Sequence, residues 1–326
     1  MKTESSFAVK RVLKVLLFPL VLIRRQFLKA REMWYARHNP KKLANIKYKA
    51  NYGKDINWDN PKNLYEKINW MKFNTDLTEW ARLSDKYLVR EYVKERGRED
   101  LLINLLGVWE RAEDIDFDNL PNSFVLKSNH GSGTVLVVHD KSKLNIPKVR
   151  KELNKWLGFT FGIDTAEPHY MLIKPLLLAE ELLTNDCKQS TSLVDYKVWC
   201  LNGKPYCFMI CANRVLGRGM EMAYYDMNWK QIPEMLTGHH KNDNEKVIID
   251  KPKCLPELIK AAEDLSKGHP EVRVDFYVVN DRVYFGEMTF TSYGAYENCI
   301  APKYLEEMGS LVTLPEKKST NDRKHQ

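Results

Sequence analysis

The sequence lacks the short motifs by which several common classes of protein are recognised. Its six cysteines include no Cys-x-x-Cys pair. We therefore expect neither a zinc site nor a disulfide framework, which fits a reducing compartment. No Gly-x4-Gly-Lys-Ser/Thr loop is present, nor a complete Gly-x-Gly-x-x-Gly motif opening a helix. These absences argue against a P-loop nucleoside triphosphatase and against a dinucleotide-binding enzyme of the Rossmann fold.

The N-terminal apolar run is too short to cross a bilayer. Val15–Ile23 has nine residues and is broken by Pro19, whereas a transmembrane helix needs about 20. Lysines and arginines flank the run, and no small-x-small cleavage site follows it. We expect residues 7–31 to form a basic, apolar helix that lies on anionic lipid at the membrane surface. The alternative is a helix that packs on the body of the protein or on a partner.

Positive charge is concentrated in the first 50 residues. The 326-residue chain carries a net charge of +8, while residues 1–50 contain 13 Lys/Arg and two Glu, a net of +11 that leaves −3 for the rest. Because the body is not basic, we expect no nucleic-acid partner. The predicted organisation is a basic amphipathic arm (1–50), a mainly helical region (51–120), a nucleotide-binding and catalytic region (121–315) and a disordered tail (316–326).

The segment 124–138 has the pattern of a strand, a glycine loop and a second strand. Two short runs rich in Val and Leu flank Asn129, His130, Gly131, Ser132 and Gly133. Glycines tolerate positive φ, so such a loop can aim several backbone N–H groups at one anion. Lys127 adds a mobile positive charge, and the combination suits a polyphosphate. The alternative is a plain hairpin with a solvated lysine, and for His130 a turn residue is favoured over a phosphate contact or base.

The segment 273–289 has the pattern of a β-hairpin that carries two acids. If its loop were the three residues 280–282, Asp275 would lie opposite Glu287, whereas a two-residue loop would turn the acids apart. Two opposed carboxylates repel each other unless something lies between them. Mg²⁺ is a suitable occupant because it prefers one or two carboxylates together with phosphate oxygens. Neutralisation by Arg273 or Lys197 is the alternative.

Three further signals are weaker. The apolar run Leu176–Ala179 ends in Glu180 and Glu181, and a strand end with a free backbone edge can hold a base and a ribose. Lys197 stands on the strand before Asn202-Gly203, a strong hairpin signal, and a lysine that points into a sheet face needs an anionic partner. Arg214 supplies a second cation after the following strand. The alternatives are an ordinary strand end and surface salt bridges.

Helices are expected in the region before the glycine loop. Asn60-Pro61 is predicted to open one of them, and Ser84 is a plausible N-cap for another at 84–95. Within that helix Lys86 and Arg90 share a face, which we interpret from the residues alone as solvated.

The order of these elements resembles the ATP-grasp fold, and specifically the TupA-like ATP-grasp family of bacterial cell-surface polysaccharide loci. The resemblance covers roughly residues 60–315. The matching stretches are Leu83–Arg90, Leu105–Trp109, Phe124–Gly133, Ala179–Glu181, Asp195–Lys197, Val272–Asp275, Gly286–Phe290 and Gly309–Leu311.

The resemblance implies an α+β protein in which two α+β lobes sandwich ATP, with a helical N-terminal extension. It implies that the glycine loop closes over the triphosphate, that the two glutamates border adenine and ribose, and that charge neutralisation supports catalysis. The implied catalytic residues are Lys127, Lys197 and Arg273; the nucleotide ligands are Lys127, Asn129, Gly131, Ser132, Gly133, Glu180, Glu181 and Lys197; the Mg²⁺ ligands are Asp275 and Glu287; and His130, Arg214 and Arg218 are substrate candidates. The sequence departs from the pattern at Thr289, where many ATP-grasp enzymes have Asn.

The activity implied by the resemblance is that of a carboxylate–amine ligase that proceeds through an acylphosphate. Its expected place is capsule, teichuronopeptide-like or exopolysaccharide assembly at the inner face of the cytoplasmic membrane. The expected substrates are an acidic sugar and an amino acid, free or lipid-linked. The alternatives are a glycosyltransferase of the same pathway and a non-catalytic nucleotide-binding partner. The first would need an Asp-x-Asp motif, which is absent between Lys127 and Glu287, although Asp116-Phe-Asp118 lies in the acidic linker before the glycine loop.

Overall fold

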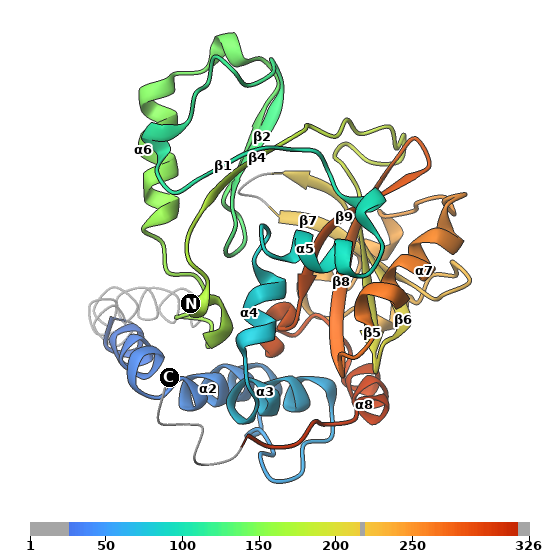
Figure 1. Ribbon diagram of the computed structural model, residues 1–326. Coiled ribbons are helices and arrows are strands. Elements are labelled where there is room, and N and C mark those ends of the chain that lie inside the picture. Colours follow the sequence, from blue (N-terminus) through green and yellow to red (C-terminus); the bar gives the residue numbers. More distant parts are fainter. Residues whose placement is uncertain (1–25, 216–218, 319–326) are drawn as a thin grey trace, which may run out of the picture.

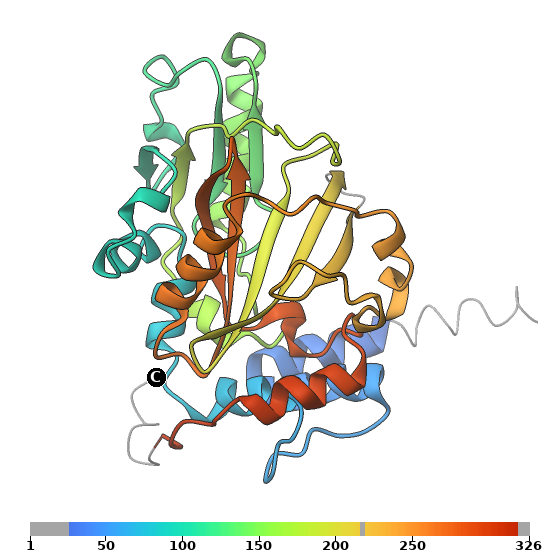
Figure 2. The ribbon, with the colours of Figure 1, turned by 90° about the vertical axis from the view of Figure 1, so that its right-hand side faces the viewer.

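Two antiparallel sheets form the framework of the protein (Figures 1 and 2). The computed structural model describes residues 26–215 and 219–318. The small sheet has the order β1 (Leu105–Trp109), β4 (Leu177–Glu180), β2 (Phe124–Ser128), β3 (Val135–Val138). The large sheet has the order β7 (Gly219–Tyr225), β6 (Lys204–Val215), β5 (Asp195–Leu201), β8 (Glu271–Val279), β9 (Arg282–Thr289). With the helices, these sheets confirm the predicted α+β class.

Helices cover the sheets and form a separate layer beneath them. Residues 26–38 are helical, and α2, α3 and α8 lie together at the bottom of Figure 1. Helix α6 packs on β2 of the small sheet, and α7 packs on β5, β6 and β8 of the large one. The bounds are α2 (Pro40–Tyr52), α3 (Leu64–Asn74), α4 (Thr78–Ser84), α5 (Val89–Glu95), α6 (Ile146–Leu157), α7 (Leu255–Ser266) and α8 (Pro302–Leu311).

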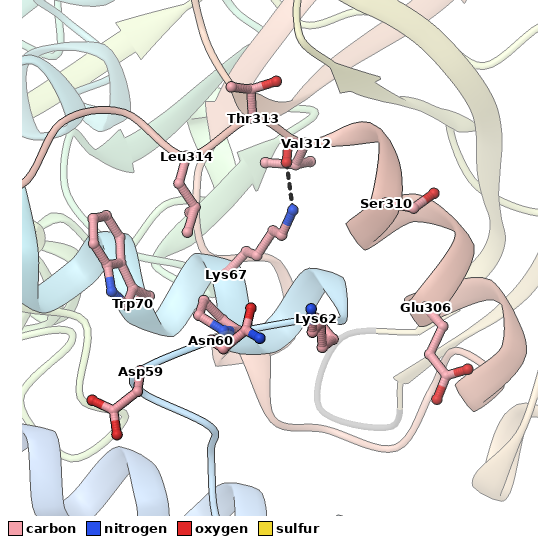
Figure 3. A pocket seen from close by; sticks show the side chains of 11 residues that line it. Asp59, Asn60, Lys62, Lys67, Trp70, Glu306, Ser310, Val312, Thr313 and Leu314 are labelled. Atoms are coloured by element: carbon pink, nitrogen blue, oxygen red, sulfur yellow. Dashed lines mark hydrogen bonds between the residues drawn. The ribbon is translucent and has the colours of Figure 1, made fainter.

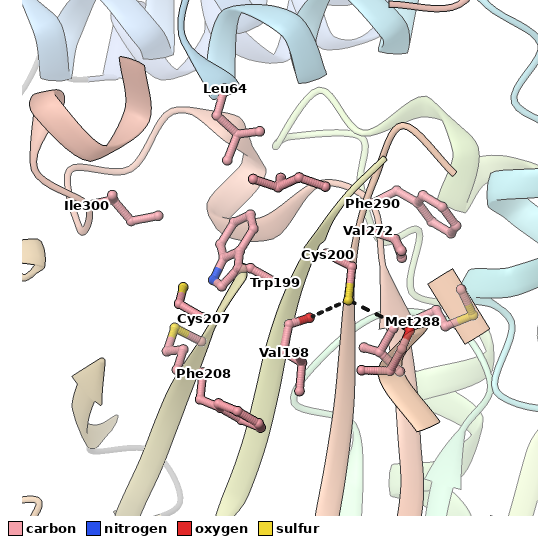
Figure 4. Packing of buried hydrophobic residues seen from close by; sticks show 14 of the residues in the cluster. Leu64, Val198, Trp199, Cys200, Cys207, Phe208, Val272, Met288, Phe290 and Ile300 are labelled. Atoms are coloured by element: carbon pink, nitrogen blue, oxygen red, sulfur yellow. Dashed lines mark hydrogen bonds between the residues drawn. The ribbon is translucent and has the colours of Figure 1, made fainter. Parts of the chain in front are cut away.

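Each sheet has its own hydrophobic core. The larger core joins the large sheet to the helical layer, and Figure 4 shows Leu64, Trp199 and Phe208 among its members. The smaller core lies between the small sheet and α6 and includes Phe124 and Leu153. Because no buried residue is shared between these clusters, the protein is built as two lobes.

The turn between β8 and β9 differs from the three-residue loop considered above. It has two residues, Asn280 and Asp281, with φ of 52° and 58°, a conformation that Asn and Asp tolerate. The pairing is regular as far as Phe276 and Phe285 and then shifts, so that Asp275 faces Glu287. The extra residue is Gly286, which forms a β-bulge. The two acids therefore face each other because of the bulge at Gly286 and not because of the length of the turn.

Two predicted helix starts are wrong. Helix α4 ends at Ser84 and α5 begins at Val89, so there is no continuous helix over 84–95 and Ser84 is not its N-cap. The Asp85 carboxylate instead accepts hydrogen bonds from the backbone N–H groups of the two residues 87 and 88, at 2.8 and 3.2 Å. Helix α3 begins at Leu64 behind an Asn63 capping box, and not at Asn60-Pro61.

Candidate nucleotide site

A row of charged side chains crosses one face of the large sheet. Lys197 on β5 pairs with Asp275 on β8, and Asp275 pairs with Glu287 on β9. Directly paired residues of neighbouring strands point to the same face. Arg273 and Thr289 form the adjacent pair on that face, two residues along. The register thus gathers the two predicted metal ligands and two predicted catalytic residues.

These side chains form a buried ion-pair network. Arg273 donates two hydrogen bonds to Asp275, from Nε to Oδ1 at 2.7 Å and from Nη2 to Oδ2 at 2.8 Å. The contact is therefore bidentate. Lys197 also donates to Asp275 and lies 3.5 Å from Asp195. Burial lowers the pKa of Lys197, but Asp195 and Asp275 outweigh burial and raise it above its ordinary value. The pKa of Arg273 is raised in the same way, chiefly by Asp275, so both side chains are cationic.

A second charged cluster lies on the small sheet. The Lys127 ammonium is 2.5 Å from Glu180 Oε2, and Arg90 Nη1 is 3.4 Å from Glu180 Oε1. Arg90 also donates Nη2 to the carbonyl of Ile103 at 2.8 Å. Strand β4 lies between β1 and β2, so the free backbone edge expected for it is wrong. Of the two predicted glutamates, Glu180 is buried in this cluster, whereas Glu181 is exposed.

The glycine loop is anchored at its start by Asn129. This buried side chain donates Nδ2 to Asp85 Oδ2 and to the carbonyl of Lys174, both at 2.9 Å, and its Oδ1 accepts from the N–H of Leu176 at 2.7 Å. The amide is fully engaged with protein groups. Asn129 therefore anchors the start of the loop, and its role as a nucleotide ligand stays a prediction.

The remaining loop residues differ in exposure. His130 is buried, with Nε2 2.9 Å from the carbonyl of Phe159, and burial lowers its pKa. Gly131 has φ of 79°, and a Cβ there would lie 2.6 Å from the Phe161 ring. Ser132 and Gly133 are exposed at the tip. This tip is the part of the loop that is accessible to a ligand.

Lys86 links the glycine loop to the acid pair of the large sheet. Its ammonium donates to the carbonyl of Gly131 at 2.7 Å and lies 3.2 Å from Glu287 Oε2. Burial favours the neutral form of Glu287, but Lys86, Lys197 and Arg273 outweigh this and hold its pKa well below the usual range. The sequence analysis did not predict that Lys86 contacts the glycine loop and Glu287.

The solvated face expected for Lys86 and Arg90 is wrong, because their side chains are 15% and 16% exposed. In the sequence, two cations one helical turn apart look the same whether they meet water or an active site. The sequence did contain one indication of their role. The stretch Leu83–Arg90 resembles the family, but we assigned no function to its two cations.

The other predicted residues lie at the margin. Arg214 is exposed and pairs with Asp195 at 2.6 Å, which extends the ion-pair row to β6. Thr289 accepts a hydrogen bond from Arg273 Nη2 at 3.2 Å. Arg218 lies outside the described residues.

The network has the composition expected of a metal–nucleotide site. Within the described ranges no three His, Cys, Asp or Glu side chains converge as a metal cage. Asp275 and Glu287 are adjacent, however, and Mg²⁺ needs only one or two carboxylates when phosphates complete its shell. The cations Lys86, Lys197 and Arg273, which now neutralise these acids, are the partners that phosphates require. The residues present therefore fit ATP and Mg²⁺.

A cleft lies away from this network. It has a volume of about 790 Å³ and lies at the helical layer, where Lys67 of α3 donates to the carbonyl of Val312 at 2.6 Å (Figure 3). None of the predicted site residues lines it. The candidate nucleotide site is thus identified by its converging charges and not by this cleft.

Two lobes with a glycine loop on one and an acid pair on the other make this an ATP-grasp protein. The model of the TupA-like ATPgrasp family matches residues 66–313. The chain therefore belongs to the TupA-like ATP-grasp family, which confirms the predicted family and fold. A comparison with curated proteins gave no match.

Solved structures with a similar fold include several ligases. D-alanine–D-alanine ligase from Bacillus anthracis, solved with ATP, has 15% identity and a TM-score of 0.40 over 67% of this chain and 57% of its own. The Helicobacter pylori ligase has 16% identity and a TM-score of 0.39 over 78% and 68%. The ATP-grasp ligase PsnB has 12% identity and a TM-score of 0.38 over 75% and 66%. Because these values are low, we base no property of the site on them.

Proposed function

We propose that this protein is an ATP-dependent carboxylate–amine ligase of cell-surface polysaccharide assembly. The observation that carries the proposal is the gathering of Lys86, Lys197 and Arg273 around the facing acids Asp275 and Glu287. Membership of the TupA-like ATP-grasp family supports ATP as the phosphoryl donor. The polysaccharide pathway rests on the resemblance of the sequence to that family.

The charges support an exchange of partners when nucleotide binds. Each acid of the pair is held by cations, so Mg²⁺ alone would have to displace these ion pairs. A triphosphate would give Lys127, Lys197 and Arg273 new anionic partners and leave Asp275 and Glu287 to the metal. Bound Mg²⁺ would supply neutralisation of charge at the transferred phosphoryl group. We therefore expect Mg²⁺ to bind strongly only together with ATP.

The proposed reaction has two steps. An oxygen of the substrate carboxylate attacks the γ-phosphorus, the bond to the β–γ bridging oxygen breaks, and ADP leaves with that electron pair. The amine nitrogen then attacks the acylphosphate carbon, the C–N bond forms, and phosphate leaves as the nitrogen gives up its proton. No side-chain nucleophile is needed. The buried, pre-oriented cations Lys197 and Arg273 hold charge in place throughout, which is the main catalytic contribution in such transfers.

The proposed substrates are an acidic sugar and an amino acid. Arg214 supports this proposal because its guanidinium is exposed at the end of the ion-pair row, where it can meet a substrate carboxylate. His130 is not assigned to substrate, since its ring is buried and its Nε2 lies 2.9 Å from a backbone carbonyl.

Calorimetry of ATP binding, with and without Mg²⁺, tests the nucleotide site. Loss of a charged contact costs roughly 1.5–3 kcal/mol, or about tenfold to more than a hundredfold in affinity. We expect that loss for Lys127→Ala with or without Mg²⁺, and for Glu287→Gln chiefly when Mg²⁺ is present. Lys174→Ala is the matched control, because Lys174 forms an exposed pair with Glu110. Binding of a sugar nucleotide in place of ATP would instead identify a glycosyltransferase.

ADP release tests the chemistry. The wild type is incubated with ATP, Mg²⁺ and pairs of uronic acids and amino acids, and ADP is measured together with the amide product. We expect release that depends on both substrates. ATP binding without ADP release from any pair would contradict a ligase and point to a non-catalytic nucleotide-binding partner.

A further inference from the structure

The helix at residues 26–38 presents one face to solvent. Its inner side includes Ala36, which is buried, and Tyr35, which packs against the larger core. On the outer side Phe27, Arg31 and Trp34 are all exposed, at a spacing of i, i+4 and i+7 that puts them in one stripe. Phe27 is 67% exposed and Trp34 is 56% exposed. The helix thus packs against the core on one side and leaves two large apolar side chains exposed on the other.

The outward position of Trp34 is held by local contacts. Its ring stacks on His38 with the centroids 4.7 Å apart, and His38 Nδ1 lies 2.8 Å from the carbonyl of Trp34. Tyr35 meets the same ring edge-on at 5.3 Å. A ring fixed in this way loses little conformational freedom on binding, which favours a docking role.

The positive charge around the exposed stripe favours an anionic partner. Residues 26–42 contain five basic side chains and one acidic one, Glu32. From residue 51 onward the chain has a net charge of −3. An anionic surface would attract the helix and weakly repel the body, which sets one orientation. The basic residues are Lys29, Arg31, Arg37, Lys41 and Lys42.

We propose that this face docks on an anionic lipid bilayer. Phe27 and Trp34 enter the interfacial region, where aromatic side chains are favoured, and Arg31 meets the head groups. The site of docking extends along residues 27–38, beyond the membrane-binding helix predicted at 7–31. Residues 7–25 of that predicted helix lie outside the described ranges. No helix in the described parts of the chain is long and apolar enough to span a membrane. This inference does not depend on the ligase proposal.

Co-sedimentation of the full chain with vesicles tests the proposal. The probes are vesicles of phosphatidylcholine alone and of phosphatidylcholine mixed with phosphatidylglycerol. We expect the wild type to sediment with the mixed vesicles, less so as salt is raised, because exposed charges are screened. Phe27→Ala/Trp34→Ala should weaken that partitioning about tenfold or more, since two aromatic side chains no longer enter the interface. Arg31→Glu should weaken binding to mixed vesicles alone.

The control is Leu172→Ala/Leu311→Ala, which removes two exposed apolar side chains of other elements and should leave partitioning unchanged. Circular dichroism establishes that each variant is folded. Partitioning that is equal for the wild type and Phe27→Ala/Trp34→Ala would overturn the proposal, because residues 1–25 would then suffice. So would a vesicle-independent dimer in sedimentation analysis that the same double variant abolishes, since the face would then be an interface between copies.

Discussion

The ammonium group of Lys86 joins the glycine loop of the small sheet to the acid pair of the large sheet. It donates to the carbonyl of Gly131 and pairs with Glu287. This cation lies beside a carboxylate that is a predicted ligand of Mg²⁺. At the scale of single residues, Lys86 therefore sets the charge of the predicted metal ligand.

Replacement of Lys86 by Met should raise the pKa of the Glu287 carboxyl. Burial already favours its neutral form, and Lys86 is the foremost of the cations that oppose burial. We expect a rise of about one unit or more, since a close pair at low dielectric is worth at least ~1.4 kcal/mol. Carboxyl carbon-13 NMR of the ligand-free protein measures it, with the signal assigned by its loss in Glu287→Gln. An unchanged titration in Lys86→Met would disprove the pairing, and Lys174→Met serves as control.

The glycine loop and the β8–β9 hairpin show how elements position these residues. In the hairpin, the bulge at Gly286 corrects the register that a two-residue turn would give. A Cβ at Gly286 would lie only 3.0 Å from the carbonyl oxygen of Asp275, so glycine permits the strands to approach closely there. In the loop, Gly131 and Gly133 both have positive φ but differ in their surroundings.

Alanine substitutions at Gly131 and Gly133 form a matched pair at the scale of the loop. Both force alanine into a left-handed backbone, at a cost of roughly 1–2 kcal/mol. At Gly131 the new Cβ would also lie 2.6 Å from Phe161, whereas at Gly133 no atom lies within 4 Å. We therefore expect Gly131→Ala to weaken ATP binding about tenfold more than Gly133→Ala in calorimetry, since overpacking costs ~1–3 kcal/mol. Equal effects would refute the packing explanation, and Phe161→Ala should partly rescue Gly131→Ala.

At the scale of the whole molecule, two lobes with separate cores meet at the segment that carries Lys86 and Arg90. The segment 181–194 joins β4 of one sheet to β5 of the other. Lobes with separate cores can move relative to each other. The Lys86 contacts to Gly131 and Glu287 lie where such a motion would be felt, so nucleotide binding and lobe arrangement are expected to be coupled.

Acid stability is a property of the whole molecule that depends on His169. The ring is buried beside Trp80 and Tyr170, and burial, aided by Lys72, lowers its pKa to about 3. The unfolded chain, with an ordinary pKa of about 6.5, binds more protons between those values, so the free energy of unfolding falls as pH falls through that range. Lowering the pH from 7 to 5 should cost the wild type about 2 kcal/mol more than His169→Phe. Urea unfolding at the two pH values measures this, and equal losses would contradict it.

The sequence by itself determined the elements that local chemistry specifies. Short Val- and Leu-rich runs gave β2 and β3, Asn202-Gly203 gave the β5–β6 turn, and the apolar spacing of 147–159 gave α6. These predictions succeeded because side-chain periodicity and turn residues act over a few positions. The facing of Asp275 and Glu287 was one of two registers considered, and it arises from the bulge at Gly286 and not from the three-residue loop with which it was linked.

Only the tertiary structure decided where the remaining polar groups lie. It placed Lys86 and Arg90 beside the predicted site residues and put β4 inside its sheet. It also engaged the amide of Asn129 with Asp85 and with the backbone just before β4. Each of these outcomes depends on contacts between residues about 40 or more positions apart in the chain. A cation or an amide has the same local pattern in solvent and in a site, and only packing between distant segments separates the two.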